Sequence, residues 1–147
     1  ALSHIRAAAA DIGIDPEFLA KHDLHVHVPA GAIPKDGPSA GVTMASAILS
    51  AARRMPVRQD VAMTGEITLS GLVLPVGGIR EKALAARRHG IKTVILPALN
   101  EPDLAELPPE IQQDMKFVPV ETLEQVIKVA MAEVAPNSES VHADRVQ

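Results

Sequence analysis

A serine lies in a segment that is typical of a helix start, at residues 34–41 (Pro-Lys-Asp-Gly-Pro-Ser-Ala-Gly). Pro38 loses no hydrogen bond at a first helical position, Asp36 is placed to cap the helix, and Gly37 can adopt backbone angles that other residues resist. Ser39 would then lie in the first turn, where backbone N–H groups and the helix dipole can stabilise an oxyanion. Ser39 is therefore a candidate nucleophile, and a second helix cap is the alternative interpretation.

Lys82 is a charged residue in the apolar stripe of another predicted helix, over residues 79–89. A projection at about 100° per residue places it between Ala85 and Ala86. To accept a proton the amine must be neutral, so its pKa must fall from ~10.4 to ~7–8. Burial can supply the roughly 3.5–4 kcal/mol that this shift requires. The alternative is a lysine whose stem covers the two alanines while its amine reaches water.

Together, Ser39 and Lys82 predict amide-bond hydrolysis by a serine–lysine dyad. Thr64, in a strand that a glycine interrupts, could supply the hydroxyl that orients the lysine, or could be an ordinary strand threonine. His25 and His27 share one face of a predicted strand, so either is an alternative base for Ser39. Two histidines without a third ligand do not predict a metal site.

The composition predicts one soluble domain with an aliphatic core. The chain has 147 residues, no Trp, Tyr or Cys, and two Phe, so Ala, Val, Ile, Leu and Met must build the core. The lack of cysteine excludes thiol catalysis and fits a reducing compartment. A formal charge of -4 provides no basic surface for nucleic acid. Because no apolar run approaches the length of a membrane span, an intracellular location is expected.

These side chains must be positioned by a mixture of helices and short strands, which alternate along the chain without a repeat. We predict helices or helical turns over 3–10, 15–17, 38–54, 79–89, 100–107 and 123–134. We predict strands over 23–28, 61–69, 72–76, 93–96 and 117–120. A hairpin around Ser70-Gly71 should interrupt any clean βαβ alternation, and a capping box at Thr122 should begin the last helix. The strand over 93–96 is expected to be buried on both faces.

The combination of motifs resembles the proteolytic domain of A-type Lon proteases. Residues 34–41 match that family's serine motif at all eight positions. Lys82 is similar to its catalytic lysine, 43 residues after the serine, as the family has it. The similarity also covers residues 25–29 and 63–68 and continues to about Glu133.

The resemblance implies a serine endopeptidase with Ser39 as nucleophile and Lys82 as general base. It also implies that Thr64 helps to hold the lysine and that Asp36 contributes to switching the serine loop between inactive and active shapes. His27 is a further supporting candidate. The implied fold is α+β, with short mixed sheets packed with helices, and is shared with a ribosomal small-subunit protein domain.

For the intact enzymes, the resemblance implies homohexameric ATP-dependent proteases that degrade damaged, unfolded and regulatory proteins. Their location would be the cytoplasm of a bacterium or the mitochondrial matrix of a eukaryote. No GxxxxGK[ST] loop occurs in this sequence, so ATP and magnesium are expected on a separate ATPase module, and neither cofactor nor metal is expected in this chain. Membrane and nucleic-acid partners are not expected.

The family's protease domain normally begins some tens of residues earlier, with strands that precede the first predicted helix. We therefore expect residues 1–135 to form an N-terminally truncated protease domain that lacks its first strands. The polar segment 136–147 is expected to be a flexible tail.

Two other functions fit the sequence. A catalytically silent Lon-like assembly or binding module is one, although the presence of both Ser39 and Lys82 argues against it. A serine hydrolase that uses His25 or His27 as its base is the other. Replacement of Lys82 or His27 distinguishes the two mechanisms, because only the true base is needed to activate Ser39.

Overall fold

The computed structural model describes residues 2–10, 12–15, 17–28 and 37–131. The helices are α1 (Leu2–Ala7), α2 (Phe18–Lys21), α3 (Gly41–Arg53), α4 (Ile79–Arg88), the 3-10 helix η1 (Ala98–Glu106), α5 (Pro109–Asp114) and α6 (Leu123–Ala130). The strands are β1 (Val61–Met63), β2 (Glu66–Ile67), β3 (Val73–Leu74), β4 (Thr93–Pro97) and β5 (Lys116–Val120). None of the helices within the described ranges is long and apolar enough to cross a membrane.

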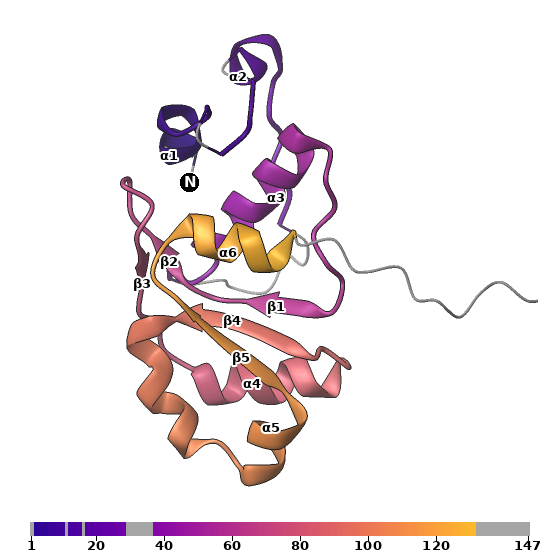
Figure 1. The fold of residues 1–147 in the computed structure, drawn as a ribbon, viewed down its shortest axis with the longest axis vertical. Coiled ribbons are helices and arrows are strands. Elements are labelled where there is room, and N and C mark those ends of the chain that lie inside the picture. The colour runs from indigo at the N-terminus through magenta and orange to yellow at the C-terminus, as the bar shows by residue number, and fades with distance from the viewer. Residues whose placement is uncertain (1, 11, 16, 29–36, 132–147) are drawn as a thin grey trace, which may run out of the picture.

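A parallel three-stranded sheet in the order β1-β4-β5 forms the middle of the molecule (Figure 1). Its register pairs Ala62 with Val94, and Val94 with Phe117. The central strand, β4, is buried along its whole length. This burial on both faces is what the sequence predicted, and it arises because helices cover each side of the sheet. Strands β2 and β3 form a separate antiparallel pair.

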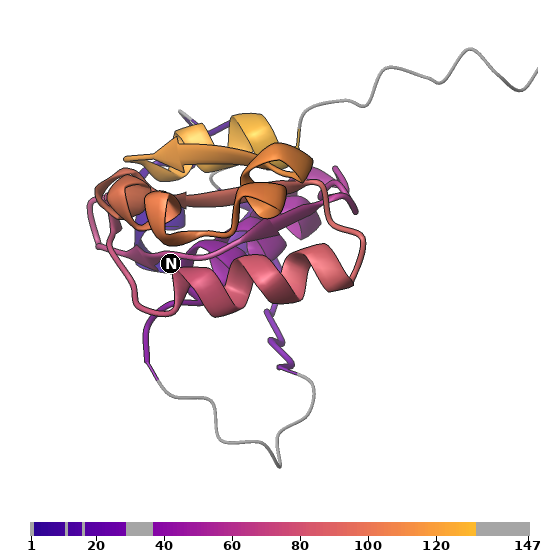
Figure 2. The same ribbon diagram turned by 90° about the horizontal axis from the view of Figure 1, so that it is seen from below.

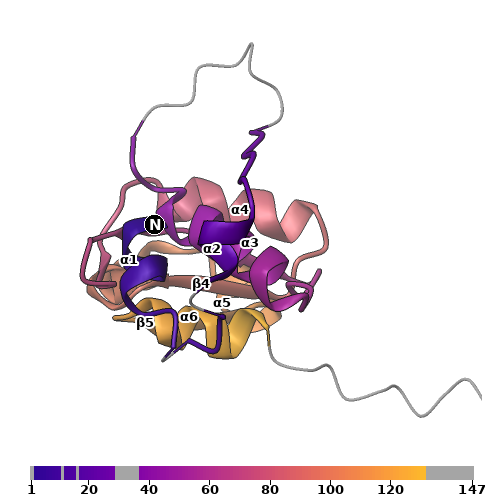
Figure 3. The same ribbon diagram turned by 90° about the horizontal axis from the view of Figure 1, so that it is seen from above.

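Consecutive residues of β4 point into different apolar clusters, as strand geometry requires. Ile95 belongs to a cluster with residues of α1, α3 and α6, the helices seen over the sheet in Figure 3. Val94 belongs to a second cluster with residues of α4 and α5, which lie on the side seen in Figure 2. Each cluster has one phenylalanine at its margin: Phe18 packs against the first and Phe117 against the second.

The predicted hairpin forms only in the part next to its turn. Residues 66–67 pair with 73–74 around the predicted turn, but β1 leaves at Thr64 and joins the parallel sheet with β4. Gly65 lies where the chain changes direction, at a point with little room for a side chain. A Cβ placed on it would lie 2.8 Å from the Val73 side chain. As expected, the hairpin interrupts a simple βαβ alternation, yet the three strands of the central sheet are all parallel.

The predicted strand over 23–28 is wrong. Residues 22–28 have no regular secondary structure, and Val26 and Val28 are 49% and 48% exposed. Their alternating pattern is that of a strand, but a strand also needs a neighbour for its backbone groups. None of the strands within the described ranges pairs with this segment.

The remaining boundaries differ by a few residues. Helix α1 ends at Ala7 rather than residue 10, and α6 ends at Ala130, while η1 begins at Ala98 instead of Asn100. Helix α5 was not predicted. Asp36 and the predicted tail over 136–147 lie outside the described residues.

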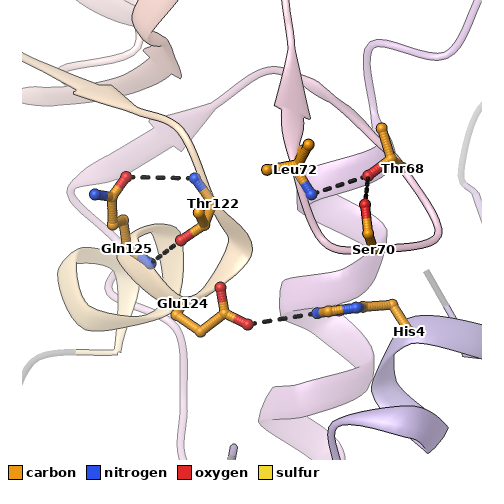
Figure 4. Close-up of polar contacts among 7 residues, drawn as sticks. All are labelled: His4, Thr68, Ser70, Leu72, Thr122, Glu124 and Gln125. Atoms are coloured by element: carbon orange, nitrogen blue, oxygen red, sulfur yellow. Dashed lines mark hydrogen bonds and ion pairs between the residues drawn. The ribbon is translucent and has the colours of Figure 1, made fainter.

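Helix α6 begins with the predicted capping box (Figure 4). The backbone N–H of Gln125 donates to Thr122 Oγ1, and the Gln125 side chain accepts from the Thr122 N–H. Nearby, buried His4 of α1 places Nε2 3.5 Å from Glu124 Oε1, which is ion-pair range but long for a hydrogen bond. His4 also packs against Gly71 of the hairpin turn. The N-terminal helix, the hairpin and α6 therefore meet at one point.

Candidate active site

Ser39 lies in a turn immediately before α3 and is half-buried. The prediction that this helix starts at Pro38 is wrong, because α3 begins at Gly41 with Ala40 as its N-cap. The reason is a tertiary contact: the Ser39 carbonyl accepts a hydrogen bond of 2.9 Å from the Gly65 N–H, which turns it away from the helix. The serine is thus fixed by the β1–β2 connection as well as by α3.

The start of α3 lies very close to β2. The Val42 N–H donates to the Gly65 carbonyl at 3.1 Å. A Cβ placed on Gly41 would lie 2.9 Å from the backbone nitrogen of Ile67, so a side chain at position 41 would separate the helix from the strand. Gly41 is therefore required for the position of the turn that carries Ser39.

Lys82 lies in the first turn of α4, after Gly78, whose φ of 71° begins the helix. Its Nζ donates hydrogen bonds to Thr64 Oγ1 at 3.1 Å and to the Gly77 carbonyl at 2.9 Å. Desolvation by burial lowers the pKa of Lys82 below its ordinary value. The predicted helix thus places its lysine in the partly dry surroundings that a neutral amine requires.

Thr64 connects the lysine to the serine turn. The threonine is buried, with 5% of its surface exposed. Its Oγ1 accepts from Lys82 Nζ and donates to the Ser39 carbonyl at 3.2 Å. Of the two interpretations that the sequence left open, this geometry favours the hydroxyl that orients the lysine.

Ser39 and Lys82 line the same two hollows. One, of about 410 Å³, lies toward β1 and the face of α4. The other, of about 460 Å³, lies toward the loop that contains Val76 and Gly77. Within the described part of the chain there is no hydrogen bond between Ser39 Oγ and Lys82 Nζ. The two side chains therefore share a cleft, and Thr64 links Lys82 Nζ to the backbone carbonyl of Ser39 rather than to its hydroxyl.

Asn100 supports one wall of this cleft, and the sequence did not identify it as a functional residue. The side chain is buried, donates to the Val76 carbonyl and accepts from the Val76 N–H, both at 2.9 Å. These bonds hold the segment next to Gly77, whose carbonyl receives the lysine. In the sequence, Asn100 has only the signal of a helix start.

The two histidines are placed differently from the serine and lysine. His25 and His27 are exposed, and neither lines the hollows that contain Ser39. Over the described ranges, no three His, Cys, Asp or Glu side chains gather closely enough to hold a metal ion. The candidate site therefore consists of Ser39, Lys82 and Thr64. Asp36 lies outside the residues that the structure describes.

An α+β fold that holds a serine before a helix and a desolvated lysine in the same cleft defines a class of protein, the serine hydrolases that would use an amine as base. Comparison with known proteins then identifies the family. The family model for the Lon protease (S16) C-terminal proteolytic domain matches residues 1–133. The chain belongs to the Lon protease family and corresponds to its C-terminal proteolytic domain, with an α+β fold.

Individual relatives agree with this assignment. The chain is 54% identical to the Lon protease of Chloroflexus aurantiacus over 141 residues, which cover 96% of this chain and 17% of that protein. It is 53% identical to the Lon protease of Dictyoglomus thermophilum over 146 residues, 99% of this chain and 18% of the relative. It is 58% identical to Lon protease 2 of Thermus thermophilus over 131 residues, which cover 89% of this chain and 16% of that protein. The chain thus spans about a sixth of the length of these relatives.

Proposed function

We propose that this domain hydrolyses peptide bonds with Ser39 as nucleophile and Lys82 as general base. The observation that supports the proposal best is the position of Lys82 Nζ. It is held by Thr64 Oγ1 and the Gly77 carbonyl in the cleft that Ser39 lines, with a lowered pKa. A lysine that merely covered apolar surface would extend its amine into water instead.

The reaction proceeds in two halves. Neutral Lys82 accepts the Ser39 Oγ proton as the oxygen attacks the peptide carbonyl, and backbone N–H groups around Ser39 stabilise the oxyanion. Lys82 then gives that proton to the leaving amine, and the carbon–nitrogen bond breaks to leave an ester on Ser39. In the second half, water attacks the ester, Lys82 accepts the water's proton and returns it to Ser39 Oγ. The missing Ser39–Lys82 hydrogen bond is compatible with this scheme, because such bonds often tighten only when substrate binds.

Thr64 keeps the lysine amine directed into the cleft. Asp36 and His27 have supporting roles in the proposal only through the family resemblance. Asp36 would contribute to switching the serine loop between its inactive and active shapes, and His27 stays a supporting candidate.

The longer protein of which this domain would form part is an ATP-dependent protease. Its substrates are unfolded, damaged and regulatory proteins, it acts as a homohexamer, and it is located in the bacterial cytoplasm or the mitochondrial matrix. ATP and magnesium act on an ATPase module outside this sequence, which contains no phosphate-binding GxxxxGK[ST] loop. The family membership and the absence of cysteine, which fits a reducing compartment, support this proposal.

Covalent labelling of the chain with a simple alkyl fluorophosphonate tests the chemistry. The wild type should be labelled at Ser39, Ser39→Ala should not be labelled, and Lys82→Met should lose most labelling. Lys92→Met is the matched control, since Lys92 is exposed and lies on the approach to β4. If Lys82→Met were labelled normally while His27→Ala was not, the base would be histidine. If the wild type were not labelled at all, the chain would be a silent module.

A further inference from the structure

The Gly77 carbonyl, which accepts from Lys82 Nζ at 2.9 Å, belongs to the exposed connection between β3 and α4. Strand β3 ends at Leu74 and α4 begins at Ile79, so the carbonyl lies in neither element. A Cβ placed on Gly77 would have no atom within 4 Å outside its chain neighbours, so side-chain packing does not hold this residue. Glycine also has more backbone freedom than any other residue. The position of this acceptor therefore depends on hydrogen bonds made by the residues beside it.

Asn100 pairs with the backbone immediately before Gly77. Its Oδ1 accepts from the Val76 N–H and its Nδ2 donates to the Val76 carbonyl, each at 2.9 Å. A side-chain amide offers a donor and an acceptor as a peptide group does, so Asn100 takes the place of a neighbouring strand beyond the end of β3. The two bonds fix the planar peptide groups on both sides of Val76. Only the two backbone angles of Gly77 then separate the fixed backbone from the carbonyl that accepts from the lysine.

Asp103 fixes the orientation of that amide. Asn100 Nδ2 also donates to Asp103 Oδ2 at 2.7 Å. The two residues are three apart in the 3-10 helix η1, in which side chains at i and i+3 lie over each other. A carboxylate can only accept hydrogen bonds, so the amide must present its nitrogen, and not its oxygen, to Asp103. The buried amide of Asn100, with 6% of the residue exposed, therefore has the one orientation that matches Val76.

The lysine amine is held from two separate segments. Its second acceptor, Thr64 Oγ1 at 3.1 Å, lies in the connection from β1 to β2, whereas Gly77 follows β3. Two acceptors restrict the direction of the amine more than either does alone. Without the Gly77 carbonyl in place, the amine would keep one anchor and could turn into the hollow of about 460 Å³ that Val76 and Gly77 line. The connection between β3 and α4 thus determines where the amine points.

We propose that Asn100 is a positioning residue for the reaction: through Val76 it holds the Gly77 carbonyl, which directs the Lys82 amine within the cleft that Ser39 lines. Asp103 contributes by fixing the Asn100 amide. The inference rests on the proposed function, because the direction of the amine matters only if Lys82 is the base. It gives η1 a role in the reaction, although no residue of η1 lines the two hollows that contain Ser39.

Exchange of the Asn100–Asp103 pair tests this role. Asn100→Asp keeps the shape of the side chain and an acceptor for the Val76 N–H, but its carboxylate cannot donate to the Val76 carbonyl and lies beside a second carboxylate. The double variant Asn100→Asp/Asp103→Asn removes the like-charge pair and still lacks the donor. Above neutral pH, both variants should react with the alkyl fluorophosphonate about ten- to a hundredfold more slowly than the wild type, because a misplaced catalytic group costs about that much. Asp103→Asn alone keeps an oxygen that accepts from Asn100, so it should react near the wild-type rate.

A pH series separates positioning from a merely structural role. Burial lowers the pKa of Lys82, so an amine released from the Gly77 carbonyl toward water should titrate closer to the ordinary 10.5. The midpoint of Ser39 labelling should therefore rise in both variants that carry Asn100→Asp. His89 is the other titratable side chain that lines the hollow of about 410 Å³, and His89→Gln should leave the wild-type midpoint unchanged.

Leu104→Ala is the matched control for stability. Leu104 belongs to the same helix η1, but its side chain packs against the apolar cluster of α4 and α5 and has no hydrogen-bonding group. The variant should unfold at lower urea than the wild type. Its labelling rate per folded molecule and its pH midpoint should stay those of the wild type.

The double variant also decides between the two possible causes of a slow Asn100→Asp. If it regained the wild-type rate, repulsion between carboxylates would be the cause, and the proposal would be wrong. If Asn100→Asp does not fold, the double variant carries the test, because it has no like-charge pair. A rate that fell only in proportion to the folded fraction, with an unchanged midpoint, would leave Asn100 a structural role alone.

The same labelling separates failure of this inference from failure of the proposed function. Normal labelling of both variants, together with loss of labelling in Lys82→Met, would refute the role of Asn100 and leave the dyad standing. If the wild type does not react, or if Lys82→Met reacts normally, the proposed function fails and this inference fails with it.

Discussion

At the scale of single residues, the proton acceptor determines how the reaction should depend on pH. Burial lowers the pKa of Lys82 from the ordinary 10.5, so its neutral form becomes available at lower pH than for a lysine in water. The rate of Ser39 labelling should rise with pH as Lys82 loses its proton. The rate should fall when the pH is below the pKa of Lys82 in the folded protein. The midpoint, measured over a pH series, should lie below 10.5. A midpoint that followed a histidine and disappeared in His27→Ala would contradict Lys82 as the base.

Thr64 should affect the rate through the lysine that it holds. Thr64→Val keeps the shape of the side chain but removes the oxygen that accepts from Lys82 Nζ at 3.1 Å. We expect a rate of Ser39 labelling about ten- to a hundredfold lower, because a misplaced catalytic group can cost about that much. Thr64→Ser, which keeps the hydroxyl, should remain near the wild-type rate. Equal rates for the two variants would assign Thr64 a structural role only.

The candidate residues were visible in the sequence to different degrees. Lys82 could be predicted from helical periodicity, because a charge in an apolar stripe conflicts with the pattern. Asn100 could not, since its partner is the backbone of Val76, 24 residues away. The hollow of about 410 Å³ was also hidden, because its lining comes from both β1 and α4, which are separated in the sequence. Contacts between distant segments leave no local signal.

At the scale of secondary-structure elements, the approach of α3 to β2 fixes the turn that carries Ser39. In Gly41→Ala, the new Cβ would meet the Ile67 backbone at 2.9 Å, and backbone cannot move as a side chain does. We expect the free energy of unfolding in urea to fall by about 1–3 kcal/mol, as for other overpacked sites. Labelling of Ser39 should fall as well. Gly77→Ala is the stability control, because a Cβ there has nothing within 4 Å. An equal loss of unfolding free energy in both variants would contradict the close approach of α3 to β2 as the cause.

Helices were predicted better than strands, for a physical reason. The periodicity that predicts α4 and α6 belongs to each segment alone, whereas a strand depends on a neighbour. Residues 23–28 have a strand pattern without a paired strand, and β1 has its partner, β4, 32 residues later in the chain. The early start predicted for α3 has a related cause, since Gly65 takes the Ser39 carbonyl that the helix would have used.

At the scale of the whole molecule, β4 joins the two apolar clusters, so they should unfold together. Ile95 and Ile111 are fully buried on opposite sides of the sheet. Replacement of either by alanine should lower the free energy of unfolding by about 2–5 kcal/mol. In both variants, circular dichroism should follow a single transition shifted to lower urea. A biphasic transition in Ile111→Ala would show that the α3–α6 side folds independently of the α4–α5 side.

The single phenylalanine at each cluster has an optical consequence. The chain contains neither tryptophan nor tyrosine, so it emits no indole or phenol fluorescence of its own. Phe18→Trp would place one fluorophore beside the cluster of α1, α3 and α6, and Phe117→Trp would place one beside the cluster of α4 and α5. Because both rings are only partly buried, a somewhat larger indole can be accommodated. The emission of each variant then reports on one side of the sheet without any background from the other.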